Sequence, residues 1–171
     1  PVYAAAVILP SDCVIEGLND SKKLTEKKRE ALFDEIKEKA LAYGIASADE
    51  KEIDEINILN ATFLAMKRAI DSLSVKPDLA LIDGNQKPHT DIEEVTVIKG
   101  DAKSMSIAAA SVLAKVSRDR FMLEMAEKYP QYEFARHKGY GTKLHYEKIA
   151  QYGVCDIHRR TFLKKILGEQ K

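Results

Sequence analysis

Two short apolar runs that each lead to an aspartate constrain the fold of this chain more than any other feature. Leu79–Ile82 ends at Asp83, and Val95–Ile98 leads through Lys99 and Gly100 to Asp101. Short apolar runs bounded by turn residues are typical of buried strands, so each carboxylate is predicted where a strand meets solvent. Acids brought to one edge of a sheet can share a divalent cation, because hard ions such as Mg²⁺ and Mn²⁺ prefer carboxylate oxygens.

Each aspartate also has an interpretation that involves no ligand. Asp83 stands before Gly84, and an Asp-Gly pair is common in turns. Asp101 precedes a predicted helix, whose N-terminal dipole favours a nearby negative charge. Either residue alone is therefore a weak indication of a metal site, and the surrounding motifs have to decide.

Strand-like runs and helical periodicity alternate along the chain, which predicts an α/β domain. Two further strands are expected over Val2–Leu9 and Tyr43–Ala48. The predicted helices cover residues 26–40 after a Thr25 cap, 58–73, 144–151 and 161–167, with a long helix from a cap at Ser104 or Ser106 to Lys128.

The composition describes a soluble globular protein. The 171 residues are 45% hydrophobic and 32% charged, which suits one domain with a real core. No apolar stretch reaches the roughly 20 residues that a membrane-spanning helix needs. Cys13 and Cys155 form no C-x-x-C pair and suggest no disulfide framework, so we expect a cytoplasmic protein.

Basic residues are concentrated in the last fifth of the chain. Residues 136–171 carry nine Lys and Arg against three Asp and Glu, whereas residues 1–135 carry 18 against 24. This asymmetry separates an acidic region over residues 1–135 from a basic region over residues 136–171 of the same domain. Charge alone fits a phosphate-backbone surface or a solvated helix surface.

Six motifs carry a family resemblance. They are Gly17–Leu24 (GLNDSKKL), Leu81–Asn85 (LIDGN), Lys99–Ser104 (KGDAKS), Ser106–Ser111 (SIAAAS), Leu113–Val116 (LAKV) and His137–Thr142 (HKGYGT). In this order they resemble bacterial ribonuclease HII, the type 2 ribonuclease H family, along the whole chain. The resemblance implies a ribonuclease H-like mixed sheet flanked by helices, with a helical C-terminal region. It makes residues 1–135 an N-terminally incomplete catalytic region and residues 136–171 a basic, substrate-binding region of the same domain. It also implies an endonuclease for the RNA strand of RNA/DNA hybrids and for ribonucleotides embedded in duplex DNA.

The resemblance assigns roles to three residues. Asp83 and Asp101 match the third and fourth members of the family's acidic quartet, which binds Mg²⁺ or Mn²⁺ for two-metal hydrolysis. Tyr140 matches the tyrosine that packs on the sugar beside the ribonucleotide. An aromatic ring between two glycines suits close approach to a sugar, although a packed turn aromatic is the plain alternative.

Polar residues within the motifs are candidates for nucleic-acid contacts. Lysines position a phosphate backbone without reading its sequence, and the candidates are Lys22, Lys23, Lys103, Lys138 and Lys143. Lys103 and Lys138 are preferred because they stand inside the motifs, and a solvated surface lysine is the plain alternative for each. Asn19, Ser21 and Ser104 either hydrogen-bond the nucleic acid or cap and turn their own segments.

Other titratable residues give weaker indications. Asp119 is either a further acid near the metals or, as we expect, part of a helix-surface ion pair. The histidines form no metal set by spacing, and His158 beside two arginines suits a basic surface.

The family's first, central strand has no counterpart in this sequence. That strand carries an Asp-Glu pair followed by Gly-Arg-Gly, whereas Val2–Leu9 resembles the second strand. We therefore expect either that the sequence omits residues of the native protein, or that the chain rearranges or swaps partners to fill the gap. With two of four acids missing, weak metal binding and poor cleavage are expected. The expected state is a monomer, or a swapped oligomer if the strand is truly absent.

Two other classes of function are compatible with parts of this pattern. A non-catalytic nucleic-acid-binding module would keep the basic region and Tyr140 without a metal centre. A metal-dependent phosphotransfer enzyme for small molecules would keep the acids but show no salt-dependent binding to a duplex.

Overall fold

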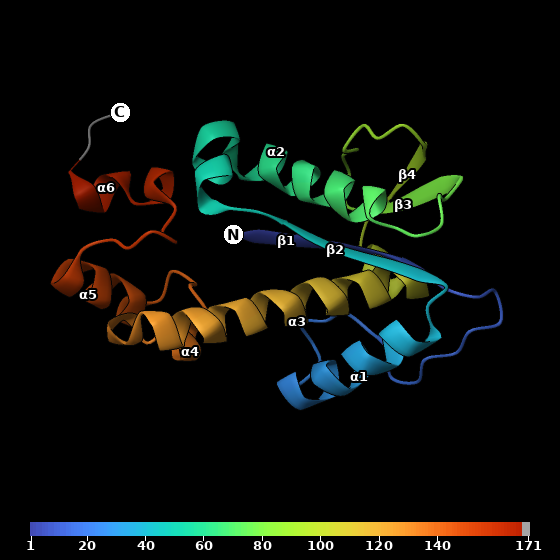
Figure 1. Cartoon of the computed structure of the whole chain (residues 1–171), viewed down its shortest axis with the longest axis horizontal. Coiled ribbons are helices and arrows are strands. Elements are labelled where there is room, and N and C mark those ends of the chain that lie inside the picture. The colour runs from blue at the N-terminus through green and yellow to red at the C-terminus, as the bar shows by residue number, and fades with distance from the viewer. Residues whose placement is uncertain (169–171) are drawn as a thin grey trace.

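The computed structural model of the chain, which describes residues 1–168, has an α/β fold whose strands form two separate pairs (Figure 1). β1 (Val2–Ile8) pairs antiparallel with β2 (Ala42–Ala48). β3 (Leu79–Asp83) pairs parallel with β4 (Glu93–Val97). The predicted α/β class and the mixture of strand directions are confirmed.

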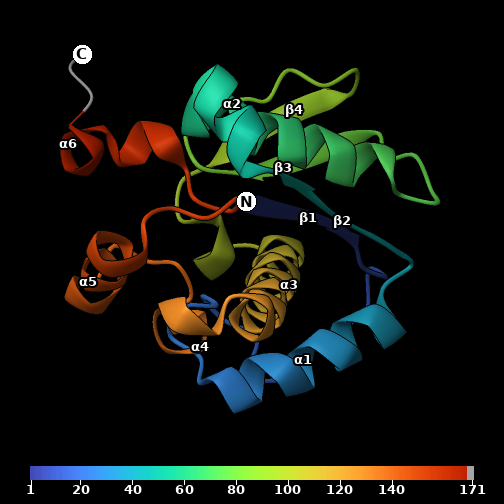
Figure 2. The same cartoon turned by 60° about the vertical axis from the view of Figure 1, so that its left-hand side comes forward.

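Helices make up most of the remaining structure. The α-helices are α1 (Glu26–Lys39), α2 (Glu50–Asp71), α3 (Met105–Lys128), α4 (Phe134–His137), α5 (Lys143–Tyr152) and α6 (Lys164–Leu167), and the 3₁₀ turns are η1 (Gly100–Ala102), η2 (Pro130–Tyr132) and η3 (Arg160–Phe162). Within residues 1–168, no helix combines the length and apolar character that a membrane crossing needs. The helical C-terminal region expected from the sequence lies at one end of α3 (Figure 2).

The β1–β2 ribbon lies between two helical layers (Figures 1 and 2). On one face, Ala61 and Ala65 of α2 pack on Ala4 and Ala48. On the other face, α1 and α3 pack together through buried apolar side chains. These are Leu32, Phe33, Ile36, Ala109, Val112, Leu113 and Val116. The small residues let α2 approach the ribbon closely, and a Cβ at Gly44 would lie 2.1 Å from the Ala69 carbonyl oxygen.

α2 consists of two helical segments joined by a kink at Asn57. Asn57 has φ 68° and ψ 166°, and its Oδ1 accepts from the Asn60 amide at 3.1 Å, which caps the second segment. The predicted helix start at Ile58 therefore matches this second segment. The first segment was not predicted, although Asp49 and Glu52 form a capping box that marks its start.

β1 and β3 face each other across a cavity of about 710 Å³. Among the described residues, no strand ladder joins them, so the two pairs do not merge into one continuous sheet. The cavity is lined by the facing strands and by side chains of the two covering helices, including Met66, Ile70, Ile107, Ala110 and Ala114. One end of this cavity reaches Asp83, the last residue of β3.

Candidate active site

Asp83 and Asp101 meet at one end of the parallel β3–β4 pair. Asp83 is the last residue of β3 and lies opposite Val97 in the ladder, and Asp101 lies in the η1 turn that follows β4. The Gly100 amide donates to Asp83 Oδ1 at 2.9 Å, which ties the turn to the strand end. The predicted delivery of both residues to one sheet edge is therefore observed.

Gly100 is required by this close approach. A Cβ at this position would lie 3.2 Å from Asp83 Oδ1 and 2.5 Å from Ile107 Cδ1. The preceding Lys99 is left-handed with φ 55°, so the chain turns sharply before the acid. A side chain at residue 100 would fill the space beside the Asp83 carboxylate.

Asp20 is a third acid at this site, which the sequence analysis did not single out. Burial raises the pKa of Asp101, and the negative charges of Asp20 and Asp83, with a hydrogen bond shared with Asp20, raise it further. Across residues 1–168, no lysine or arginine forms an ion pair with Asp83 or Asp101. The site is therefore a cluster of like charges whose repulsion a cation would relieve.

The carboxylates match a hard divalent cation in chemistry but supply only part of a coordination shell. In the described part of the chain, no three His, Cys, Asp or Glu side chains converge closely enough to enclose a metal ion. Carboxylate oxygens are the ligands that Mg²⁺ and Mn²⁺ prefer, and water or phosphate oxygens commonly complete such shells. Asp83 and Asp101 are the residues that would hold the ion.

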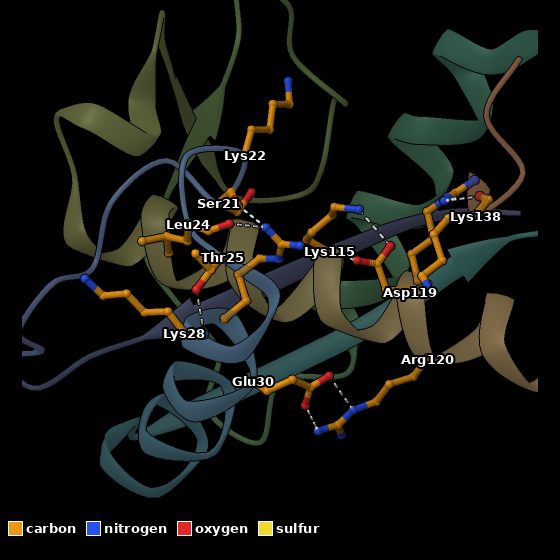
Figure 3. A network of polar contacts seen from close by, with 12 residues as sticks. Ser21, Lys22, Leu24, Thr25, Lys28, Glu30, Lys115, Asp119, Arg120 and Lys138 are labelled. Carbon is orange, nitrogen blue, oxygen red and sulfur yellow. Dashed lines mark hydrogen bonds and ion pairs between the residues drawn. The ribbon is translucent and has the colours of Figure 1, made fainter. Parts of the chain in front are cut away.

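The Asn19–Lys22 loop lies beside this acidic cluster. Asn19 Oδ1 accepts from the Asp20 amide at 2.7 Å, and Asp20 Oδ1 accepts from the Lys22 amide at 2.9 Å. Ser21 is buried, whereas the Asn19 and Lys22 side chains are exposed. Ser21 and the Asn19 side chain thus shape the loop, and Lys22 projects from it (Figure 3).

Ser104 and Lys103 follow directly after Asp101. Ser104 Oγ accepts from the Ile107 amide at 3.4 Å and so acts as the N-cap of α3. Of the two caps considered from the sequence, the first is the one used. Lys103 is exposed beside the acids, where its ammonium group faces solvent.

Tyr140 lies on a glycine turn beside α3, where its ring lies near the charged ends of Lys115 and Arg118. Its side chain is 53% exposed. Gly139 has φ +77°, and Lys138 is left-handed with φ 49°, so the turn depends on conformations that few residues tolerate. The Lys138 ammonium donates to the Ala135 carbonyl at 2.8 Å, so this lysine is partly used by its own turn.

Three buried histidines support the Tyr140 turn. His158 Nδ1 accepts from the Cys155 amide, so its Nε2 carries the proton shared with His145 Nε2 at 3.1 Å. His145 Nδ1 then donates to the Tyr140 carbonyl at 2.9 Å. His137 stacks on His145, with ring centres 4.3 Å apart, and accepts from the Gly139 amide.

The prediction of a surface position for His158 was wrong. His158 is 6% exposed, and burial, together with the repulsion that a protonated His145 would exert, lowers the pKa of its imidazole to about 4. Asp119 is likewise buried rather than on the helix surface, although the expected ion pair is present. The burial of His158 and Asp119 could not be predicted from their sequence neighbours, because residues that cover them come from distant segments of the chain.

Comparison with known proteins agrees with this arrangement. The profile of the family described as ribonuclease HII matches residues 1–165. The chain belongs to the ribonuclease HII family. It is 58% identical over 168 residues to the ribonuclease HII of Caldicellulosiruptor bescii, a match that covers 98% of this chain and 82% of the relative. Its general activity is therefore that of a ribonuclease.

Solved structures show the same fold. The ribonuclease H2 of Pyrococcus horikoshii superposes with a TM-score of 0.76 at 25% identity, covering 98% of this chain and 96% of that one. Bst-RNase HIII, solved in complex with Mn²⁺, superposes with a TM-score of 0.55 at 15% identity, covering 80% of this chain and 51% of that one. The ribonuclease H-like architecture expected from the motifs is thus confirmed.

Proposed function

We propose that this chain is an endonuclease that hydrolyses the RNA strand of RNA/DNA hybrids and cuts at ribonucleotides embedded in duplex DNA. The observation that carries the proposal is the meeting of Asp83 and Asp101 at one strand end without a cationic partner among residues 1–168. Membership of the ribonuclease HII family supports the same activity.

The proposed cofactor is Mg²⁺ or Mn²⁺, held by Asp83 and Asp101. The proximity of Asp20 and Asp83 supports this, because after burial their negative charges are the next causes that raise the pKa of Asp101, and a cation would offset that repulsion. The Mn²⁺ complex of the structurally similar Bst-RNase HIII points to the same ion class. A divalent ion bound there supplies Lewis acidity, and a pair of ions supplies the two-metal chemistry of phosphodiester hydrolysis.

The proposed substrate contacts come from the Asn19–Lys22 loop, from the start of α3 and from the Tyr140 turn. The phosphates would be contacted by Lys22, Lys103 and Lys138. Hydrogen bonds to the sugar-phosphate backbone of the nucleic acid would come from Asn19, Ser21 and Ser104. Tyr140 would pack its exposed ring on the sugar beside the ribonucleotide. The 2′-hydroxyl is the local mark that separates RNA from DNA, so recognition of this sugar makes the cut specific.

We expect the 171-residue chain to bind metal weakly and to cleave slowly. Asp83 and Asp101, even with Asp20 nearby, do not enclose an ion within the described residues. We place the activity in the cytoplasm and on a monomer, with strand-swapped oligomers where the open edges of β1 and β3 pair between copies.

The test is cleavage of a labelled DNA duplex that carries one ribonucleotide, with Mg²⁺ or Mn²⁺ and with the Asp83→Asn variant as control. Metal-dependent cutting that the substitution abolishes supports the proposal. Duplex binding that persists in EDTA and in the variant, without cutting, would instead identify a non-catalytic nucleic-acid-binding module. Absence of both binding and cutting would contradict the nucleic-acid assignment.

A further inference from the structure

Asp119 on α3 lies at the centre of a polar network between the two segments proposed to contact nucleic acid (Figure 3). Its side chain is 8% exposed. Oδ1 lies 2.7 Å from Lys115 Nζ, and Oδ2 lies 3.8 Å from an Arg29 guanidinium nitrogen. Both cations are needed here, because an unpaired buried charge is strongly unfavourable.

Arg29 on α1 connects Asp119 with the Asn19–Lys22 loop. Its Nη1 donates to the Ser21 carbonyl at 2.9 Å and also to the Leu24 carbonyl. The guanidinium group holds its donors in a fixed planar fork, so one side chain can bind two carbonyls and a carboxylate at once. The path of the loop relative to α3 therefore depends on this arginine.

Lys115 connects Asp119 with Tyr140. Its Nζ lies 3.5 Å from the Tyr140 hydroxyl and 5.5 Å from the ring centre. Arg118 adds a second cation 4.9 Å from the ring centre, and its Nη1 donates to the Lys138 carbonyl at 2.9 Å. Cations near an aromatic face are attracted to it, so these contacts orient the ring while leaving it open to solvent.

We propose that Asp119 is a positioning residue that sets the spacing between the Asn19–Lys22 loop and Tyr140. Asp119 Oδ2 faces Arg29, which holds the loop, and Asp119 Oδ1 binds Lys115, which lies beside the Tyr140 ring. This spacing would let both segments contact the same duplex. This inference rests on the proposed function, because it concerns how that substrate is held.

A second ion pair between the same helices provides a matched control. Glu30 on α1 binds Arg120 on α3 (Figure 3), and neither side chain has a hydrogen bond or ion pair with the Asn19–Lys22 loop or with residues 138–142. Glu30→Gln therefore removes an ion pair between α1 and α3 and leaves the network intact. Asp119→Asn keeps the side-chain volume but leaves Arg29 and Lys115 as uncompensated like charges.

The first experiment measures amide hydrogen exchange in the folded chain and needs no activity. In Asp119→Asn, exchange in residues 21–24 and 138–142 is expected to rise about tenfold, because both segments lose their shared anchor. In Glu30→Gln, the two segments should keep their protection. Equal changes in both variants, or no change in either segment, would overturn the positioning role.

The second experiment measures affinity for the duplex with one ribonucleotide by fluorescence anisotropy. Asp119→Asn should weaken binding about tenfold, and its effect should be non-additive with that of Tyr140→Ala, because coupled residues share one loss. Additive losses would overturn the inference. If the parent chain itself fails to bind, the proposed function fails, and the exchange experiment alone decides the role of Asp119.

Discussion

The acidic cluster and the histidine cluster use titratable side chains in opposite ways. Asp20, Asp83 and Asp101 gather like charges, and the pKa of Asp101 is raised by burial and by the neighbouring acids. His145 and His158 are neutral, with pKa values lowered chiefly by burial. Each buried histidine proton is directed at a partner, whereas no lysine or arginine of residues 1–168 pairs with the Asp83–Asp101 pair.

The difference separates a supporting cluster from a binding one. The histidines complete their own hydrogen bonds and fix the backbone at Gly139 and Tyr140, so they need nothing from solution. The acids repel one another in the folded chain, and no lysine or arginine among residues 1–168 forms an ion pair with Asp83 or Asp101. Repulsion of this kind is typical of sites where a ligand supplies the missing partner.

Removal of one acid should give the largest effect. Asp101→Asn is expected to lower cleavage by more than the roughly 10–100-fold typical of losing an outer-shell metal partner. The same variant should melt at a slightly higher temperature, because a like charge leaves the cluster. Metal-dependent cleavage and thermal unfolding of the same preparation check both. An Asp101→Asn variant that is less stable than the parent chain and equally active would contradict the assignment of the acidic cluster to binding rather than to support of the fold.

Acidification should act on the two clusters with opposite signs. His158 titrates at about 4 in the fold and at about 6.5 when unfolded, so the unfolded chain binds more protons between these values. Stability is therefore expected to fall by about 3 kcal/mol as pH drops through that window. The raised pKa of Asp101 acts in the opposite direction, because its unfavourable contribution to stability is removed as pH falls through that raised pKa toward the ordinary value of the carboxyl.

Urea unfolding from pH 7 to pH 4 measures this balance. His158→Gln should flatten the decline, since Gln carries no titrating proton. A decline of equal size in that variant would show that other groups set the acid limit.

Loss of the α3 cap should give a smaller change. Ser104→Ala removes the acceptor for the Ile107 amide and is expected to lower the free energy of unfolding by about 1 kcal/mol. Because Ser104 is also proposed to contact the nucleic acid, duplex affinity of the folded variant should weaken as well. Unchanged affinity in the folded variant would show that the hydroxyl serves only as a cap.

The smallest stability change is expected at Tyr140. Because this side chain is 53% exposed, Tyr140→Phe and Tyr140→Ala should alter the free energy of unfolding by only about 0.5 kcal/mol or less. Affinity for a ribonucleotide-containing duplex should survive in the Phe variant and fall in the Ala variant, since stacking needs the ring. Equal affinity in both variants would argue against ring packing on the sugar.

Local patterns predicted the strands, most helices and the meeting of Asp83 with Asp101. Turn residues and apolar runs act over a few neighbours, so the ends of β3 and α3 follow from the sequence around them. The kink at Asn57 is also local, and its capping side chain explains why the predicted helix began at Ile58.

Burial of polar residues was not predictable in the same way. His158 is covered by Phe134 and His145 from other elements, and Asp119 is paired with Arg29, 90 residues earlier in the sequence. Asp20 reaches Asp101 only because the loop folds back across the sheet end. Such contacts depend on tertiary packing, for which periodicity carries no signal.

The open edges of β1 and β3 also govern how the protein behaves at high concentration. Backbone groups along these edges, unpaired within the described residues, can template strand addition from another copy. The net charge of the chain is zero at pH 7, so no long-range repulsion keeps copies apart. We therefore expect that shielding a strand edge, rather than changing the salt concentration, keeps copies of the 171-residue chain apart.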